Sequence, residues 1–98
     1  MKLEILSEAE KDLIAGAEFY EAQGTGLGDY FLNSLYSDID SLLLYAGIHR
    51  VVFGFHRALS KRFPYAIFYR LERDQGLVRV YRVLDLRRDP LWIRQRLR

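Results

Sequence analysis

The chain has 98 residues and no cysteine, which predicts one domain with a modest core and excludes disulfides, thiolate catalysis and zinc-ribbon chemistry. No run of 18 apolar residues is present to span a membrane, and the short apolar run at Leu3–Leu6, broken by Glu4, is too short for a signal peptide. Residues 1–98 are therefore expected to form a single cytoplasmic domain.

The formal net charge of +2 conceals an unequal division of charge between the two halves. Residues 1–49 hold two basic and nine acidic side chains, a net charge of −7, whereas residues 50–98 hold thirteen basic and four acidic side chains, a net charge of +9. Twelve of those thirteen bases are arginines. This asymmetry favours an acidic or phosphate-bearing partner for the second half, or mutual neutralisation of the two halves across the fold.

The first part of the chain predicts a strand and then a helix. Lys2–Leu6 alternates charged and apolar residues, as an edge strand does. Ser7 and Glu10 have the spacing of a capping box, in which each side chain accepts the backbone amide of the other residue. The expected helix ends near Gly24, and its apolar positions are Ala9, Leu13, Ala17 and Tyr20, with Ile14 beside them.

Glycines at 24, 26 and 28 predict a tight reversal into a second helix. No strand precedes them, so a dinucleotide-binding loop is not indicated. The second helix is expected from Gly28 to Ala46, with Gly47 as its stop and with Asp29, Asp38 and Asp40 away from the apolar side. That apolar side consists of Leu27, Phe31, Leu35, Ile39, Leu42 and Ala46.

The centre of the predicted sheet is a hairpin of Pro64–Glu72 and Leu77–Leu86, joined by Arg73–Gly76. Both faces of each strand carry large apolar residues, as strands covered on both sides do. In the second strand, strict alternation would place Leu77, Tyr81 and Val83 on one face and Val78, Val80 and Leu84 on the other.

Two segments before the hairpin, Val51–Phe55 and His56–Arg62, are expected to be strands, and Leu91–Arg98 a short helix anchored by Leu91, Trp92 and Ile93. The predicted fold class is α+β, with element order β-α-α-β-β-β(-α). A helical hairpin packs on one face of a small antiparallel sheet.

Few residues suggest catalysis. His49 follows a helix end, which favours a capping role, whereas His56 lies among basic residues as either a general acid or base or a strand residue facing water. Neither histidine has ligand spacing to a carboxylate, so no metal site is expected. No catalytic residue and no cofactor are therefore assigned from the sequence.

Arginines interleaved with aromatic residues form the stronger signal, because that combination suits phosphate contact, base stacking or a protein interface. The alternative is a solvated face whose arginine stems cover apolar strands. In the motif Arg87-Arg88-Asp89-Pro90, Asp89 is expected to pair with one arginine and fix the turn into the last helix. The predicted basic face, for phosphate or for a partner protein, comprises Arg57, Lys61, Arg62, Arg79 and Arg82.

Two segments, Phe63–Glu72 and Val78–Pro90, resemble the ParE branch of the ParE/RelE toxin superfamily of type II toxin–antitoxin modules. The resemblance extends over nearly the whole chain, and the Y-R-x-E and R-D-P pieces are moderately specific in combination. It implies a small toxin held inactive by a cognate antitoxin that wraps the helical hairpin and a sheet edge. ParE-type members are linked to poisoning of DNA gyrase through the C-terminal end, whereas RelE-type members cleave mRNA on the ribosome.

The chain departs from both patterns. No Tyr or His follows Asp89, so the terminal acid/base of RelE-type members is absent. Asp85 stands where many ParE-like sequences have His, which leaves it as a candidate partner for Arg87 or Arg88. The resemblance therefore favours a gyrase inhibitor that acts by binding, with an endoribonuclease or a non-toxic antitoxin-binding homologue as alternatives. The residues expected to contact gyrase or its DNA complex are Arg87, Arg88, Asp89, Trp92 and Arg94.

Overall fold

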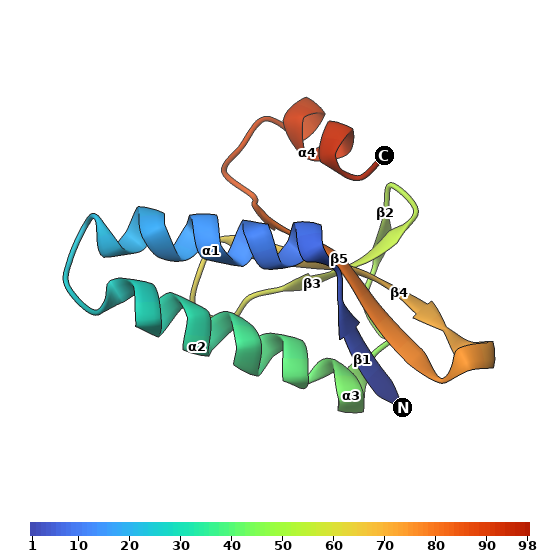
Figure 1. Ribbon diagram of the computed structural model, residues 1–98. Coiled ribbons are helices and arrows are strands. Elements are labelled where there is room, and N and C mark those ends of the chain that lie inside the picture. The colour runs from blue at the N-terminus through green and yellow to red at the C-terminus, as the bar shows by residue number, and fades with distance from the viewer.

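The computed structural model describes all residues, 1–98, as an α+β domain whose five-stranded sheet is flanked by helices (Figure 1). No helix in it is long and apolar enough to cross a membrane. The elements in chain order are β1 (Lys2–Ile5), α1 (Ser7–Glu21), α2 (Leu27–Asp40), α3 (Leu42–Tyr45), β2 (Val51–Val52), β3 (Phe55–Leu59), β4 (Tyr65–Glu72), the 3-10 turn η1 (Arg73–Gln75), β5 (Leu77–Asp85) and α4 (Pro90–Arg96).

The β4–β5 hairpin lies inside the sheet, in the strand order β1-β5-β4-β3-β2, as the sequence predicted. Strands β2 to β5 pair antiparallel, and the edge strand β1 runs parallel to β5, so the sheet is mixed. The helices and three strands that separate β1 from β5 give the chain the long connection that parallel pairing requires. The turn between β2 and β3 falls at Phe53–Gly54, so Phe55 belongs to β3 and not to the preceding strand.

A β-bulge changes which residues of β5 share a face. Tyr69 pairs with Val80 and Phe68 pairs with Arg82, which leaves Tyr81 as the extra residue. Val78, Val80 and Val83 therefore belong to the same buried cluster. The strict alternation expected from the sequence was wrong for Val83 and for Leu84, which lies in the cluster on the other face, because one inserted residue reverses the parity of the strand.

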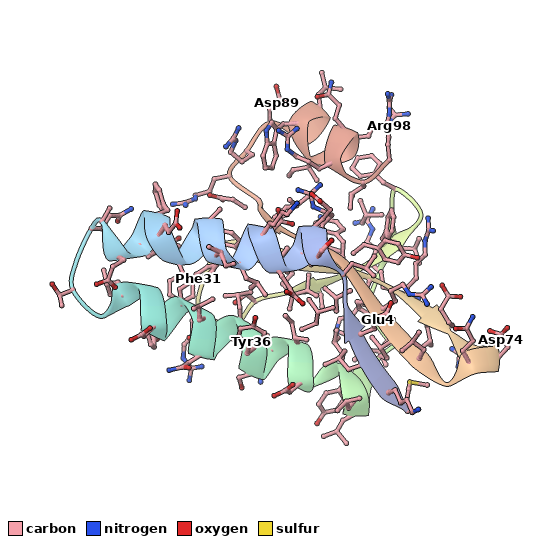
Figure 2. All side chains as sticks on the ribbon, in the orientation of Figure 1. Glu4, Phe31, Tyr36, Asp74, Asp89 and Arg98 are labelled. Atoms are coloured by element: carbon pink, nitrogen blue, oxygen red, sulfur yellow. The ribbon has the colours of Figure 1, made fainter.

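The larger core lies between the sheet and the hairpin of α1 and α2. Phe31 is fully buried there, and its ring contacts those of Tyr20, Phe63 and Tyr65 at centroid distances of 5.3, 5.0 and 4.9 Å. Figure 2 labels Phe31 between the two helices. Gly16 permits this approach, because a Cβ there would lie 2.5 Å from the Phe31 ring.

The smaller core lies on the opposite face, under α4. Successive residues of β4 alternate between the two cores. Tyr65, Ile67 and Tyr69 belong to the larger core, whereas Ala66 and Phe68 belong to the smaller one. Its six buried members are Phe55, Ala66, Phe68, Leu84, Ile93 and Leu97.

Three expectations about the helices were wrong. The amide of Glu10 bonds to the carbonyl of Leu6, so the helix starts one residue early and Ser7 makes no side-chain cap. Asp38 was expected away from the apolar side but is buried, and its carboxylate is satisfied there by hydrogen bonds from Ser60 Oγ at 2.7 Å and from the Lys61 amide at 3.2 Å. The second helix is also interrupted at Ser41, which separates α2 from α3.

The glycine-rich segment is the expected reversal between α1 and α2. Gly26 has a φ of 86°, a left-handed conformation that suits glycine. The carboxylate of Glu21 accepts hydrogen bonds from the amides of Gly26 and Gly28. The loop amides therefore bind a side chain of the same protein, which explains the turn without a phosphate.

Candidate target-binding site

Helix α4 follows from the sequence Asp89-Pro90. The Asp89 carboxylate accepts the amide of Leu91 at 2.8 Å, and Pro90 occupies the first turn, where its missing N–H is not needed. Ile93 and Leu97 are buried against the sheet, whereas Leu91 is 63% exposed and anchors nothing. The expected anchors were therefore correct for Ile93 and wrong for Leu91.

Trp92 of α4 is held between two arginines. The guanidinium carbons of Arg88 and Arg96 lie 4.0 and 3.9 Å from its ring centroid. Such cation–π contacts orient the guanidinium groups and consume none of their hydrogen-bond donors. Both groups therefore stay available to an anionic partner.

Asp85 and Arg87 form a local clasp before α4. Arg87 Nη2 lies 2.8 Å from Asp85 Oδ2, and the Arg87 backbone amide donates to Oδ1 at 2.9 Å. Burial alone would raise the pKa of Asp85, but the hydrogen bonds and charge of Arg87, with Arg88 nearby, lower the pKa below its ordinary value. The carboxylate that pairs with an arginine here is thus Asp85, and the expected pairing of Asp89 was wrong because that side chain caps α4.

Two members of the predicted basic face, Arg79 and Arg82, bind the protein's own carboxylates. Arg79 lies 2.7 Å from Glu4 and 3.5 Å from Glu72. Arg82 donates twice to Asp12, at 2.8 Å each, in the bidentate geometry that guanidinium and carboxylate prefer. The charges of both arginines are therefore paired with carboxylates of the protein itself.

Asp12 also accepts a hydrogen bond from a backbone amide at the uncovered edge of β5. Its Oδ2 accepts the Val83 amide at 3.0 Å, at a point where β1, which pairs only with residues 77–80, no longer covers the strand. Asp12 is the residue of α1 that binds both a strand backbone and Arg82.

The other members of the predicted basic face separate from one another. Lys61 and Arg62 are exposed after β3, whereas Arg57 is partly buried and its Nε has no hydrogen-bond partner. Arg57 borders a hollow with Phe53, Arg88 and Ile93 on the α4 side of the sheet. Arg57 and Arg88 therefore meet at one surface, while Lys61 and Arg62 lie beyond it.

Six arginines around α4 make no ion pair within the protein. We call this region, with the rings of Phe53 and Trp92, the α4 surface. Figure 2 shows nitrogen-tipped side chains gathered around α4 between the labelled Asp89 and Arg98. The six arginines are Arg57, Arg70, Arg88, Arg94, Arg96 and Arg98.

The histidines lie elsewhere, around the buried hydroxyl of Tyr69. This hydroxyl accepts the Gly47 amide at 2.9 Å and hydrogen-bonds to His49 Nδ1, so the expected helix-capping role of His49 was wrong. His56 stacks on the Tyr69 ring, and its Nδ1 bonds to the His49 carbonyl at 2.8 Å. Burial, with the nearby His56, lowers the pKa of His49 below its ordinary value of 6.5. No group of three or more His, Cys, Asp or Glu side chains is clustered as metal ligands are.

A comparison with protein families matches residues 3–90 to the model described as "ParE toxin of type II toxin-antitoxin system, parDE". The chain belongs to the ParE toxin family of type II toxin–antitoxin systems. The resemblance noted in the sequence is thus confirmed.

A search of curated proteins gave no match to this ParE-family chain. Among solved structures, one titled "Chromosomal ParDE TA system from P. aeruginosa" is similar, with a TM-score of 0.71. It is 17% identical and covers 88% of this chain and 96% of that one. At that identity the similarity establishes the fold.

Sequence reasoning did not assign Phe53, Arg96 and Arg98 of this ParE-family domain to a binding surface. Arg70 lies over the rings of Phe55 and Tyr81, at 4.1 and 5.2 Å, and so joins the α4 surface from β4. A signal was present in Phe53-Gly54, because glycine after a bulky residue between two apolar strands marks a hairpin turn that exposes its tip.

Proposed function

We propose that this ParE-family toxin inhibits DNA gyrase by binding the enzyme or its DNA complex through the α4 surface. The observation that carries the proposal is the set of six unpaired arginines beside Trp92 and Phe53. Arginine and tryptophan are the residues most enriched where a few side chains supply most of an interface's binding energy. Within the set first assigned to the target, Arg88, Trp92 and Arg94 make the contacts, whereas Arg87 and Asp89 hold the turn and the helix that present them.

We further propose that a cognate antitoxin neutralises the toxin by placing an acidic segment on the α4 surface. The family assignment supports an antitoxin partner, and complementary charge supports this location. An acidic segment there would also cover the groups that meet the target. The toxin would act in the cytoplasm, where gyrase is found.

Induction of the gene in cells is the first experiment. We expect filamentation and induction of the DNA-damage response, with translation initially unaffected. A prompt arrest of translation with mRNA cut on the ribosome would contradict the proposal and support an endoribonuclease. Normal growth would support a homologue that binds its antitoxin without being toxic.

Coexpression with the adjacent open reading frame tests the antitoxin. We expect restored growth and copurification of the two proteins, and an antitoxin variant with its acidic residues changed to Gln or Asn should neither copurify at moderate salt nor restore growth. An unchanged complex with that variant would place the antitoxin elsewhere on the toxin.

A further inference from the structure

Three grooves border α4, and each is lined by arginines. The largest, about 470 Å³, lies between α1 and α4 and is lined by Arg88, Trp92 and Arg96. The second, about 280 Å³, lies against the β2–β3 turn and includes Arg57 and Arg88. The third, about 270 Å³, lies at the end of α4; its lining includes Phe55, Arg70, Arg96 and Arg98.

Shared residues connect the three grooves. Arg88 borders the first and the second, and Arg96 borders the first and the third. Arg57 lines the second groove, and its buried Nε has no hydrogen-bond partner within the protein. A chain-like polyanion can therefore follow one continuous path around α4 with guanidinium groups along it.

The carboxylates beside this path are already engaged. In the first groove Asp12 pairs with Arg82 and Asp85 pairs with Arg87. In the third groove Glu8 pairs with Lys11 at 3.2 Å. The unpaired charge that remains along the path is therefore positive, which favours phosphates.

Phe53 adds an aromatic platform at one end of the path. It has a φ of 54°, in the left-handed region, which a residue with a Cβ adopts only under backbone strain. The residue is nevertheless 48% exposed, and its ring centroid lies 5.9 Å from the Arg94 guanidinium carbon. An exposed aromatic residue, held by a strained backbone beside a cation without an ion pair, suits stacking of an unpaired base next to a bound phosphate.

We propose that the α4 surface binds single-stranded DNA directly, with phosphates on Arg88, Arg94 and Arg98 and a base on Phe53. The choice of a single strand follows from the base stacking, because paired bases do not present their faces. The choice of DNA rests on the proposed function, in which the toxin meets gyrase engaged with DNA.

The experiment measures fluorescence anisotropy of dye-labelled oligonucleotides of about 15 nucleotides with the purified full-length chain, without gyrase. The probes are a single DNA strand, its duplex and the RNA of the same sequence. We expect the single DNA strand to bind tightest, with an affinity that falls as salt rises. Equal or tighter binding of duplex or RNA would overturn the proposal, as would absence of binding at low salt.

A matched pair of variants separates the site from net charge. R88Q/R94Q/R98Q removes three charges from the α4 surface, and R50Q/R62Q/R73Q removes three exposed charges outside it. We expect the first variant to lose roughly tenfold or more in affinity and to reduce the salt slope by about 2, because each phosphate contact on a single strand contributes about 0.7. Equal losses in both variants would overturn the proposal.

Phe53→Asn separates the stacking role from a structural one. Asn tolerates the left-handed conformation, so this variant should melt at an equal or higher temperature while binding single-stranded DNA about fivefold or more weakly. Unchanged DNA binding would remove Phe53 from the site.

Gyrase inhibition by the same protein preparations keeps the two proposals distinguishable. A toxin that inhibits supercoiling but does not bind the oligonucleotide refutes direct DNA binding and leaves gyrase inhibition standing. A toxin that binds DNA through the α4 surface but leaves gyrase active refutes gyrase inhibition and leaves direct DNA binding standing.

Discussion

The two faces of the sheet differ in how they are covered. One face lies under α1 and α2, helices of 15 and 14 residues, and buries a cluster of 13 residues. The other lies under α4, a helix of 7 residues, over a cluster of 6. Six of the nine arginines that make no ion pair gather at the thinner face, so the proposed contact surface lies where packing contributes least to the fold.

The arginines of residues 50–98 also differ in whether they are paired with a carboxylate of the protein. Arg79, Arg82 and Arg87 are bound to carboxylates of the protein and belong to the fold. Arg88 and Arg94 lie over aromatic rings and remain accessible. The neighbours Arg87 and Arg88 thus have opposite roles, which shows that a run of basic residues is not a uniform surface.

The largest expected difference between the faces is in stability. Phe31→Ala should lower the free energy of unfolding by about 3–5 kcal/mol, because it removes the ring that three aromatic neighbours contact. Ile93→Ala, in the smaller core, should cost about 2 kcal/mol, the low end for such a change. Urea unfolding followed by circular dichroism measures both, and equal losses would contradict the comparison.

Asp12→Asn should have the next largest effect on stability, because Asp12 of α1 binds both the Arg82 side chain and the Val83 amide of β5. The amide keeps the shape but loses the charge that binds Arg82 and presents N–H groups toward donors. We expect a loss of about 2 kcal/mol in the free energy of unfolding. Lys11→Gln, which breaks an exposed pair on the same helix, is the control and should change stability by less than about 0.5 kcal/mol.

Asp89→Ala should destabilise only α4, on the face of the sheet that this short helix covers. Loss of the bond to the Leu91 amide removes the cap of α4 and should cost about 1 kcal/mol locally. Hydrogen exchange should therefore accelerate at the amides of α4, with the rates in α1 and β4 unchanged. Faster exchange throughout the domain would show that α4 and the larger core unfold together.

The smallest expected effect is on the pH dependence of folding. Because the pKa of His49 is lower in the folded protein than its ordinary value of 6.5, the unfolded chain binds more protons as the pH falls below 6.5. Stability should therefore decrease from neutral to mildly acidic pH, and His49→Gln should weaken this dependence. Urea midpoints across that range test the sign, and stability that rises on acidification would contradict it.

Much of the fold could be predicted because its signals are local. Two strands apolar on both faces indicated the centre of the sheet, and Pro90 indicated the start of α4. The bulge at Tyr81 could not be predicted, since nothing in an apolar run reveals an inserted residue. The turn at Phe53–Gly54 did carry a signal, Gly54, but the apolar residues on both sides of it led to the prediction of one strand over Val51–Phe55.

The site was harder to predict because pairing across the fold decides which arginines are free. Asp85 and Arg87 are two residues apart, and their clasp is a local pattern. Asp12 and Arg82 are separated by 70 positions, so no sequence spacing reveals their ion pair. The sequence could therefore indicate that a basic surface exists, whereas only the structure distinguishes its unpaired members from those that stabilise the fold.

The central claim is that the unpaired arginines of the α4 surface, and not the positive charge of the second half as a whole, inhibit gyrase. The most direct measurement is inhibition of DNA supercoiling by purified gyrase, titrated with the wild-type chain, R88Q/R94Q/R98Q and R50Q/R62Q/R73Q. We expect the first variant to need roughly tenfold more protein for half-inhibition, while the second matches the wild type. If the two variants inhibit equally, at any level, the claim is wrong.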